Sequence, residues 1–265
     1  MRHEVDRRQA KGQFILAGSS TPDGPDQAAG RQARRHSGVG RFGVLEMRTL
    51  SWQELGWSTG EISLRAVLQR QGFAPTQSEL GAEEIAERLA LGGWPGNLGL
   101  SPEAAGLNNS NYVDLLAHED AARAWGARRD SSRLRRTLES LARNVSTECA
   151  AATLGKDAGG ADGPLSPQTI AEYLDVFRGL MIQEDLPSWN THIRSTARLR
   201  KTPKRHLADT SLCCALLGLD GPRLLADLEY MGLLFEAAVI HDLRVYAGAL
   251  GGRVYFYRDS NSQEA

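Results

Sequence analysis

The sequence predicts a mostly helical α+β protein that contains a winged helix, and three observations support this class. Apolar residues recur at helical spacing through residues 134–145. Ser166 and Pro167 form the N-cap and first-turn pair of a further helix. Directly after that helix, residues 181–189 alternate like a strand and can pair with residues 204–209. Three helices followed by a two-stranded wing is the winged-helix order.

The remaining elements follow from the same periodicities. Turn-forming residues fill positions 20–40, so this stretch is expected to be a long loop. The sequence predicts strands at 14–16, 44–47 and 253–259, a short helix capped by Ser51, and helices at 61–72, 82–91, 101–118, 147–154 and 222–247, the last as one helix or a pair.

Composition limits the partners and the compartment. The 265 residues include 31 basic and 32 acidic side chains, so only a local patch could attract nucleic acid. Cys149, Cys213 and Cys214 have no spacing typical of a disulfide framework or a zinc site. No apolar run is long enough to span a membrane, and the first residues are too charged for a signal peptide. We therefore expect a cytoplasmic protein with no membrane partner.

The strongest local charge lies in the predicted wing. Residues 193–205 contain no acid, and clustered cations of this kind are typical of contacts to DNA phosphates. The preceding helix argues for a protein partner instead, since it carries Glu172 and Asp175 against Arg178. Both partners stay open. The candidate nucleic-acid residues are Arg194, Arg198, Arg200, Lys201, Lys204 and Arg205.

Evidence for catalysis is weak. Gly155 and Lys156 lack the upstream glycine and the following hydroxyl residue of a phosphate-binding loop. Arg41, flanked by glycines in "HSGVGR", could reach the phosphate of a nucleotide held elsewhere, or be a plain surface arginine. Glu236, His241 and Asp242 could serve metal or acid–base chemistry, but a core helix with polar residues on its outer side is the favoured interpretation.

Several segments, in order, resemble a known family. They are "FILAGSS", "HSGVGRFGVLEMRTLSWQELG", "LALGGWPG", "SPQTIAEYLDVF", "EDLPSW", "RSTARLRKTPKRHLAD" and "GLLFEAAVIHDLRVYAGALGGRVYFYRDSN". Together they resemble prokaryotic ATP-binding proteins with an AAA-type ATPase first half and a C-terminal domain of unknown function 4143. The resemblance covers nearly the whole chain.

The resemblance implies roles for a few residues. Ser19 or Ser20 would be the sensor residue that ends an ATPase strand, and Arg41 would sit where an arginine finger does. Full-length relatives would bind ATP and Mg²⁺. Glu236 would precede a PD-(D/E)xK nuclease core that begins with the strand 253–259.

The chain departs from this family at both ends. It lacks the phosphate-binding lysine, the acidic metal-binding strand and the nuclease E-x-K motif, so we expect it to bind ATP poorly and to have neither ATPase nor nuclease activity. The resemblance implies four parts: an AAA-type remnant at 1–60, a helical connector at 61–129, a winged-helix-like domain at 130–209 and a truncated nuclease-like α/β domain at 210–265.

Two other hypotheses compete with a truncated ATP-binding family member. The chain could be a winged-helix DNA-binding or antitoxin-like regulator that uses residues 194–205 and needs neither missing half. It could also be a gene fragment without an independent fold. Oligomeric state and biological substrate do not follow from the sequence.

Overall fold

The fold is mostly helical. The computed structural model describes residues 4, 7–8, 12–15, 45–72, 74, 78–117, 130–189 and 202–258. Helices account for 57% of the structure and strands for 5%, and within the described residues the extended segments meet only through isolated bridges. The helical part of the prediction is therefore confirmed, whereas no sheet forms in these residues.

Most helices begin at a side chain that caps them. Ser101, Asp130, Ser166 and Asp209 each accept a hydrogen bond from a backbone N–H in the first turn of the helix that follows. The helices are α2 (Leu64–Leu68), α3 (Ala82–Leu91), α4 (Pro102–Leu115), α6 (Ser131–Arg143), α7 (Ala151–Gly159), α8 (Pro167–Gly179), α10 (Thr210–Leu217), α11 (Gly221–Leu225) and α12 (Leu228–Ala249), with single 3₁₀ turns at Pro95–Asn97 and Gly160–Asp162.

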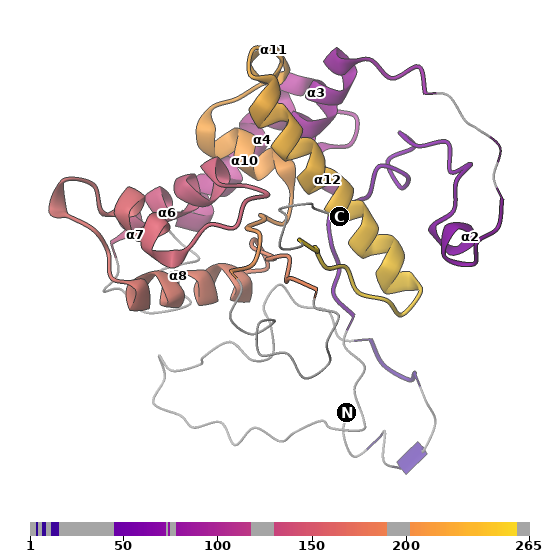
Figure 1. Ribbon diagram of the computed structural model, residues 1–265, viewed down its shortest axis with the longest axis horizontal. Coiled ribbons are helices and arrows are strands. Elements are labelled where there is room, and N and C mark those ends of the chain that lie inside the picture. Colours follow the sequence, from indigo (N-terminus) through magenta and orange to yellow (C-terminus); the bar gives the residue numbers. More distant parts are fainter. Residues whose placement is uncertain are drawn as a thin grey trace.

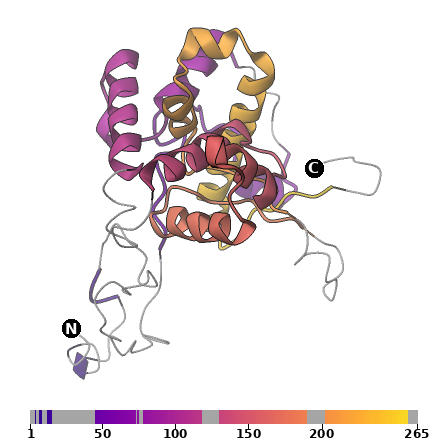
Figure 2. The ribbon, with the colours of Figure 1, turned by 90° about the vertical axis from the view of Figure 1, so that its left-hand side faces the viewer.

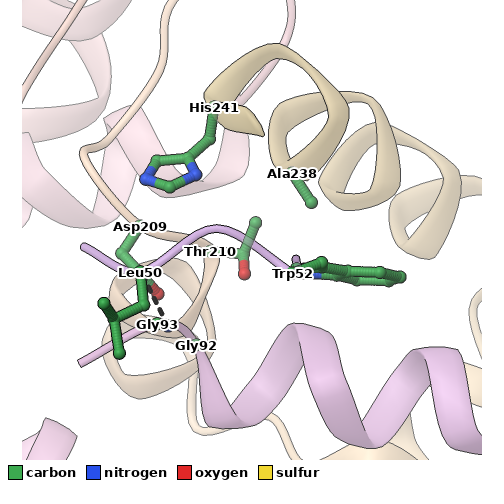
Figure 3. A pocket seen from close by; sticks show the side chains of 8 residues that line it. All are labelled: Leu50, Trp52, Gly92, Gly93, Asp209, Thr210, Ala238 and His241. Atoms are coloured by element: carbon green, nitrogen blue, oxygen red, sulfur yellow. Dashed lines mark hydrogen bonds between the residues drawn. The ribbon is translucent and has the colours of Figure 1, made fainter. Parts of the chain in front are cut away.

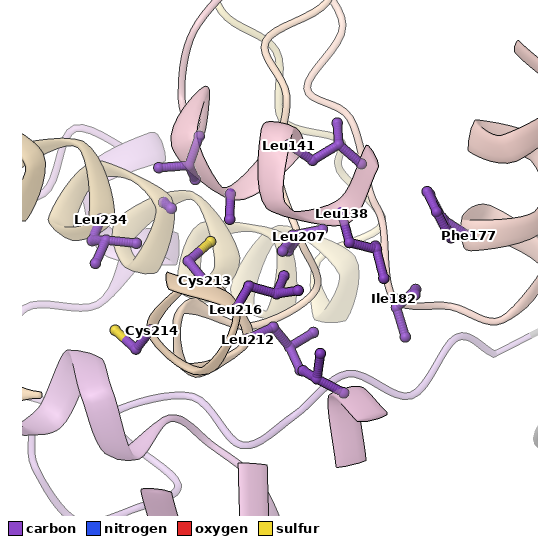
Figure 4. Packing of buried hydrophobic residues seen from close by; sticks show 14 of the residues in the cluster. Leu138, Leu141, Phe177, Ile182, Leu207, Leu212, Cys213, Cys214, Leu216 and Leu234 are labelled. Carbon is purple, nitrogen blue, oxygen red and sulfur yellow. The ribbon is translucent and has the colours of Figure 1, made fainter. Parts of the chain in front are cut away.

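Helix α10 lies at the centre of the apolar core. It packs against α3, α4, α6 and α12, while α7 lies between α6 and α8 and α11 packs on α3 (Figure 1). The side chains of Leu212, Cys213 and Leu216 on α10 are buried beside Leu138 of α6 and Leu234 of α12 (Figure 4). We call α3, α4, α6, α7, α8, α10 and α11 the helical body.

Helix α12 runs from this body to the polar part of the molecule. Its first half buries Met231, Leu234, Ala237 and Ala238, but no residue after Ala238 in the helix is fully buried. The chain then turns back toward the segments that follow α8 (Figures 1 and 2). The end of α12 is thus free to make polar contacts rather than core contacts.

Two adjacent glycines allow the chain before α2 to approach the body. Gly92 ends α3 with φ +69°, and a Cβ there would clash with the Asp209 carboxylate. A Cβ on Gly93 would clash with the carbonyl oxygen of Leu50, whose N–H donates to the Gly93 carbonyl over 2.7 Å. The glycine pair therefore fixes the path of residues 45–57, which we call the strap.

Several predicted elements differ from the structure. Residues 45–48 are irregular, with Leu45 and Met47 more than four-fifths exposed, so the strand expected at 44–47 is wrong over the part described. Ser51 starts turns rather than a helix, and only Leu64–Leu68 of the expected 61–72 helix is helical. The expected opening of a PD-(D/E)xK-like α/β core is absent from the described residues, because α12 packs on helices and the segment after it makes an isolated bridge.

Among the residues that the structure describes, no helix combines the length needed to cross a bilayer with a sufficiently apolar sequence.

Candidate functional site

The two segments that flank residues 190–201 pair as antiparallel neighbours. Leu186 and Lys204 exchange two backbone hydrogen bonds of 2.9 and 3.0 Å, and Ala208 donates to the Ile182 carbonyl over 2.9 Å. The pairing predicted between 181–189 and 204–209 is therefore present. The described chain on either side of residues 190–201 is therefore brought together by backbone hydrogen bonds.

A third segment lies beside this pair. Ser188 and Phe256 form a parallel bridge, the Trp189 N–H donates to the Phe256 carbonyl, and the Phe256 N–H donates to the Pro187 carbonyl over 3.1 Å. We define the wing base as residues 182–189, 202–208 and 253–258. It joins three parts of the chain that are distant in sequence.

Two of the six predicted nucleic-acid residues are used inside the molecule. The Lys204 ammonium donates to the Glu236 carboxylate over 2.6 Å and lies 5.8 Å from the Phe256 ring centroid. The Arg205 guanidinium pairs with Asp185 and donates to the Cys149 carbonyl over 2.9 Å. Both cationic side chains are less than one-tenth exposed. They anchor the wing base instead of facing a ligand.

The other predicted site residues fall outside what the structure describes. This holds for the four remaining cations of the wing and for the three residues that the family resemblance singled out as nucleotide contacts. They are Arg194, Arg198, Arg200, Lys201, Ser19, Ser20 and Arg41. Glu236, the predicted nuclease-core residue, is the partner of Lys204.

Glu184 joins the wing base to the strap and to α12. Its carboxylate accepts two hydrogen bonds from Arg48, of 2.5 and 2.9 Å, and lies 3.6 Å from Nε of Arg244. Burial raises the pKa of Glu184, but the Arg48 hydrogen bonds and the Arg244 charge outweigh burial and hold this pKa below its ordinary value. The carboxylate therefore stays ionised between its two arginines.

His206 is the least expected polar group of the wing base. Its side chain is buried, and neither ring nitrogen has a hydrogen-bond partner. Burial, together with the charges of Arg244 and Lys204, lowers the pKa of His206 to about 3. The imidazole is therefore neutral at physiological pH and costs stability wherever a proton is forced onto it.

The strap is fastened to α12 by a chain of polar contacts. The Thr49 hydroxyl lies 3.0 Å from Nε2 of His241, whose Nδ1 lies 3.2 Å from the Asp242 carboxylate. Asp242 also accepts from the Trp52 N–H over 3.0 Å and from the Tyr246 hydroxyl over 3.1 Å. A hydroxyl, an imidazole and a carboxylate in series resemble the arrangement that activates a nucleophile in many enzymes. Such an arrangement can react with a substrate only if there is space for the substrate beside it.

The space beside the imidazole is small, whereas a second cavity of about 170 Å³ lies beside Asp242, with mostly apolar walls that include Trp52 and Phe235. The cavity beside His241 has a volume of about 20 Å³ and is bounded by the strap, the glycine pair and the start of α10 (Figure 3). A cavity of this size holds about one water molecule. No group of three or more potential metal ligands occurs in the part of the chain that the structure describes. The contacts of Thr49 and Trp52 with α12 hold the strap against this helix.

Comparison with known proteins gives a family but no activity. Residues 82–223 match the family described as "Domain of unknown function (DUF8612)". The chain belongs to this family. The matched region begins with α3 and ends in α11, so it contains the helical body and most of the wing base. No solved structure matches the chain.

Two curated mycobacterial proteins are similar to the whole chain. The uncharacterized proteins Mb2031c of Mycobacterium bovis and Rv2008c of Mycobacterium tuberculosis are each 23% identical to it over 260 residues. The match covers 98% of this chain and 50% of each relative. The chain therefore spans about half the length of the curated relatives it matches.

These findings correct the family assigned from sequence motifs. The match is to DUF8612, and no evidence supports an AAA-type ATPase or domain of unknown function 4143. Short apolar strands and Gly-rich turns, which carried that resemblance, occur in many folds and are weak evidence without a phosphate-binding loop. The expectation of ATP and Mg²⁺ in full-length relatives rested on this assignment alone, and no observation tests it.

Sequence reasoning missed the groups that organise the site. Glu184, His206 and Trp189 were not among its candidates, because the surroundings of each are made by residues far along the chain: Arg48 for Glu184, Arg244 for His206 and Tyr255 for Trp189. The alternation in residues 181–189 located the segment but not its partners. The one available signal was the run of aromatic residues at 255–257, which Arg258 follows directly and Arg253 precedes by two positions.

Proposed function

We propose that this protein binds nucleic acid through residues 190–201, which we call the wing. In this proposal α6, α7 and α8 and the paired segments 182–188 and 204–208 form a winged-helix-like support. The mutual packing of α6, α7 and α8, followed by an antiparallel pair, supports this arrangement. The cations in the wing supply the attraction to phosphate. A regulator that binds DNA or RNA is the function class that fits.

One observation carries the proposal: the wing base divides the cations into two sets. Lys204 and Arg205 are neutralised by Glu236 and Asp185, which makes the base rigid. Residues 190–201 then hold four cations and no acid, and the carboxylates of Glu236 and Asp185 are already engaged. A stretch of sequence with four cations and no acid, next to a base whose own cations are paired, is suited to phosphate binding.

The surface of α8 restricts how nucleic acid can bind. Its outward residues include Glu172, Asp175 and Arg178, and Asp175 pairs with Arg178 over 3.0 Å. A helix with this charge is poorly suited to the major groove, where a recognition helix lies among phosphates. The wing is therefore the contact surface. The acidic surface of α8 also favours a second candidate function, a winged helix that binds a protein partner.

The test measures binding as a function of salt. Fluorescence anisotropy with labelled duplex and single-stranded oligonucleotides would compare wild type with the triple variant Arg198→Gln, Arg200→Gln, Lys201→Gln. For each phosphate that the variant no longer neutralises, the slope of log K against log[salt] should become shallower by about 0.9 on duplex and about 0.7 on single strands.

A matched variant controls for net charge. Arg65, Arg143 and Lys156 are exposed cations on α2, α6 and α7, and replacing all three by Gln removes the same charge away from the wing. This control should bind as wild type does. Equal binding by both triple variants, or no binding by wild type, would overturn the proposal, and the protein-partner candidate would then take its place.

A further inference from the structure

The side chains of the wing base alternate between two opposite faces. Successive side chains of an extended segment point in opposite directions. Ser188 and Phe256, which bridge each other, are each only 3% exposed and point toward the interior. Their neighbours Trp189, Tyr255 and Tyr257 therefore point the other way. We call these three residues the aromatic face.

Two side chains of the aromatic face, Trp189 and Tyr257, are exposed, and the ring of Trp189 lies against that of the half-buried Tyr255. The Trp189 and Tyr255 ring centroids lie 5.6 Å apart, with an interplanar angle of 61°. Trp189 is 47% exposed and Tyr257 is 38% exposed. Tyr255 and Tyr257 lie two residues apart on one side of an extended segment, so their rings follow one another along its length.

A second aromatic cluster provides a contrast within the same molecule. Trp52 and Trp57 are covered by the Arg88 guanidinium, which lies 5.9 and 5.2 Å from their ring centroids, and Phe235 packs edge-on against Trp52 at 6.1 Å. The tryptophan rings of that cluster already have a cation against them. The large exposed fractions of Trp189 and Tyr257 leave ring surface available to a ligand.

We propose that the aromatic face binds single-stranded nucleic acid by stacking on its bases. This inference rests on the proposed nucleic-acid function and names its substrate class. Exposed aromatic rings stack on any base, but the bases of a duplex are covered above and below by their neighbours. Exposed rings near cationic side chains would therefore bind unpaired bases in preference to duplex.

Charge around the aromatic face complements a phosphate backbone. Arg253 is exposed at one end of the segment, and Arg258, paired with Glu148 over 2.7 Å, lies at the other. Two arginines therefore flank the segment that carries Tyr255 and Tyr257, and one of them is in an ion pair. Stacking on the rings and attraction to these arginines would act on adjacent parts of the same strand.

The experiment compares two probes and two kinds of substitution. Anisotropy would be measured with a deoxythymidine oligonucleotide of about 16 nucleotides and with a mixed-sequence duplex of similar length. Trp189→Leu and Tyr257→Leu remove a ring, whereas Trp189→Phe and Tyr257→Phe retain one. Each leucine variant should weaken single-strand binding by about 5- to 150-fold, and each phenylalanine variant should restore most of it.

Leu228→Ala serves as the matched control. This residue is 66% exposed at the start of α12, a 22-residue helix that separates it from the aromatic face. The control should bind both probes as wild type does, and the leucine variants should retain duplex affinity and the thermal unfolding midpoint of wild type.

The outcomes separate this inference from the proposed function. If wild type binds with strong salt dependence but the leucine variants match it on single strands, the aromatic face is not the base-binding surface and the wing remains. Equal loss on both probes in the leucine variants also overturns the inference. If wild type binds neither probe, both proposals are wrong.

Discussion

In the helical body, apolar side chains pack α10 against α3, α4 and α6, and several polar side chains cap helices. At the wing base, three segments are held together by ion pairs and isolated backbone bridges. This region also buries a neutral histidine without a hydrogen-bond partner. The hydrophobic effect stabilises a fold without requiring a particular orientation of the buried groups. Charged contacts, in contrast, require particular partners and respond to pH and salt. The body is therefore suited to be a scaffold, and the wing base to be the responsive part.

The difference also indicates where a ligand acts. A binding surface needs exposed groups whose interactions are not already satisfied internally. The exposed aromatic rings belong to the wing base, and in the sequence the cation-rich segment 190–201 connects two of its parts, whereas the helical body buries Phe177, Leu212 and Leu224 almost completely. Substitutions in the body should change stability alone, and substitutions at the wing base should change stability, pH response and binding separately.

The largest expected effect is in the body. Phe177 is 1% exposed on α8 and packs beside Ile182 (Figure 4). Phe177→Ala should lower the free energy of unfolding by about 3–5 kcal/mol, because it leaves a cavity in a close-packed core. Urea denaturation followed by circular dichroism measures this. A decrease below about 1 kcal/mol would show that the body is not the packed scaffold described.

The next effect concerns the ion pair of Arg205 and Asp185. Asp185→Asn should destabilise the protein by about 3 kcal/mol, because the Arg205 guanidinium would remain buried without its carboxylate. The double variant Arg205→Met, Asp185→Leu removes both charges and should recover much of this stability. Equal denaturation midpoints for wild type and Asp185→Asn would contradict an anchoring role for the pair.

The smallest effect is the pH response of His206. Its folded-state pKa of about 3 lies below the ordinary unfolded value of about 6.5, so the unfolded chain takes up a proton first as the pH falls. Stability from the neutral imidazole is complete above about pH 6.5 and is lost progressively from there toward pH 3. Between pH 7.5 and pH 5.5 wild type should lose about 1.4 kcal/mol through this group.

The control for this response is His206→Leu, measured by urea denaturation at the same two pH values. The variant lacks the titrating group, so it should lose about 1.4 kcal/mol less than wild type over this interval. Identical losses in wild type and variant would show that His206 is solvated or paired in the folded protein.

Local sequence signals predicted the elements whose cause is local. Helix α3 coincides with its predicted range, and the Ser166–Pro167 pair marks the start of α8. Helix α7 begins and ends later than predicted. Its end was misplaced because Gly155 was expected to belong to a loop that breaks the helix. In the structure Gly155 is inside the helix, where the absence of a Cβ lets the Leu165 carbonyl approach closely.

The candidate site could be predicted only in outline. The cation-rich segment and its paired flanks follow from charge and alternation. The partners of Arg205 and Lys204 are 20 and 32 residues away, on different elements, and no periodicity connects them. The same holds for the bridge from Ser188 to Phe256, which creates the aromatic face. Tertiary packing decides these pairs, so the sequence could not distinguish anchoring cations from binding cations.

The most direct test of the central claim is the salt dependence of wild-type binding to single-stranded and duplex probes. The account predicts log K to fall linearly with log[salt] on both probes, with a higher affinity for the single strand at every salt concentration. Binding that is absent or insensitive to salt would contradict the wing as a phosphate-binding surface.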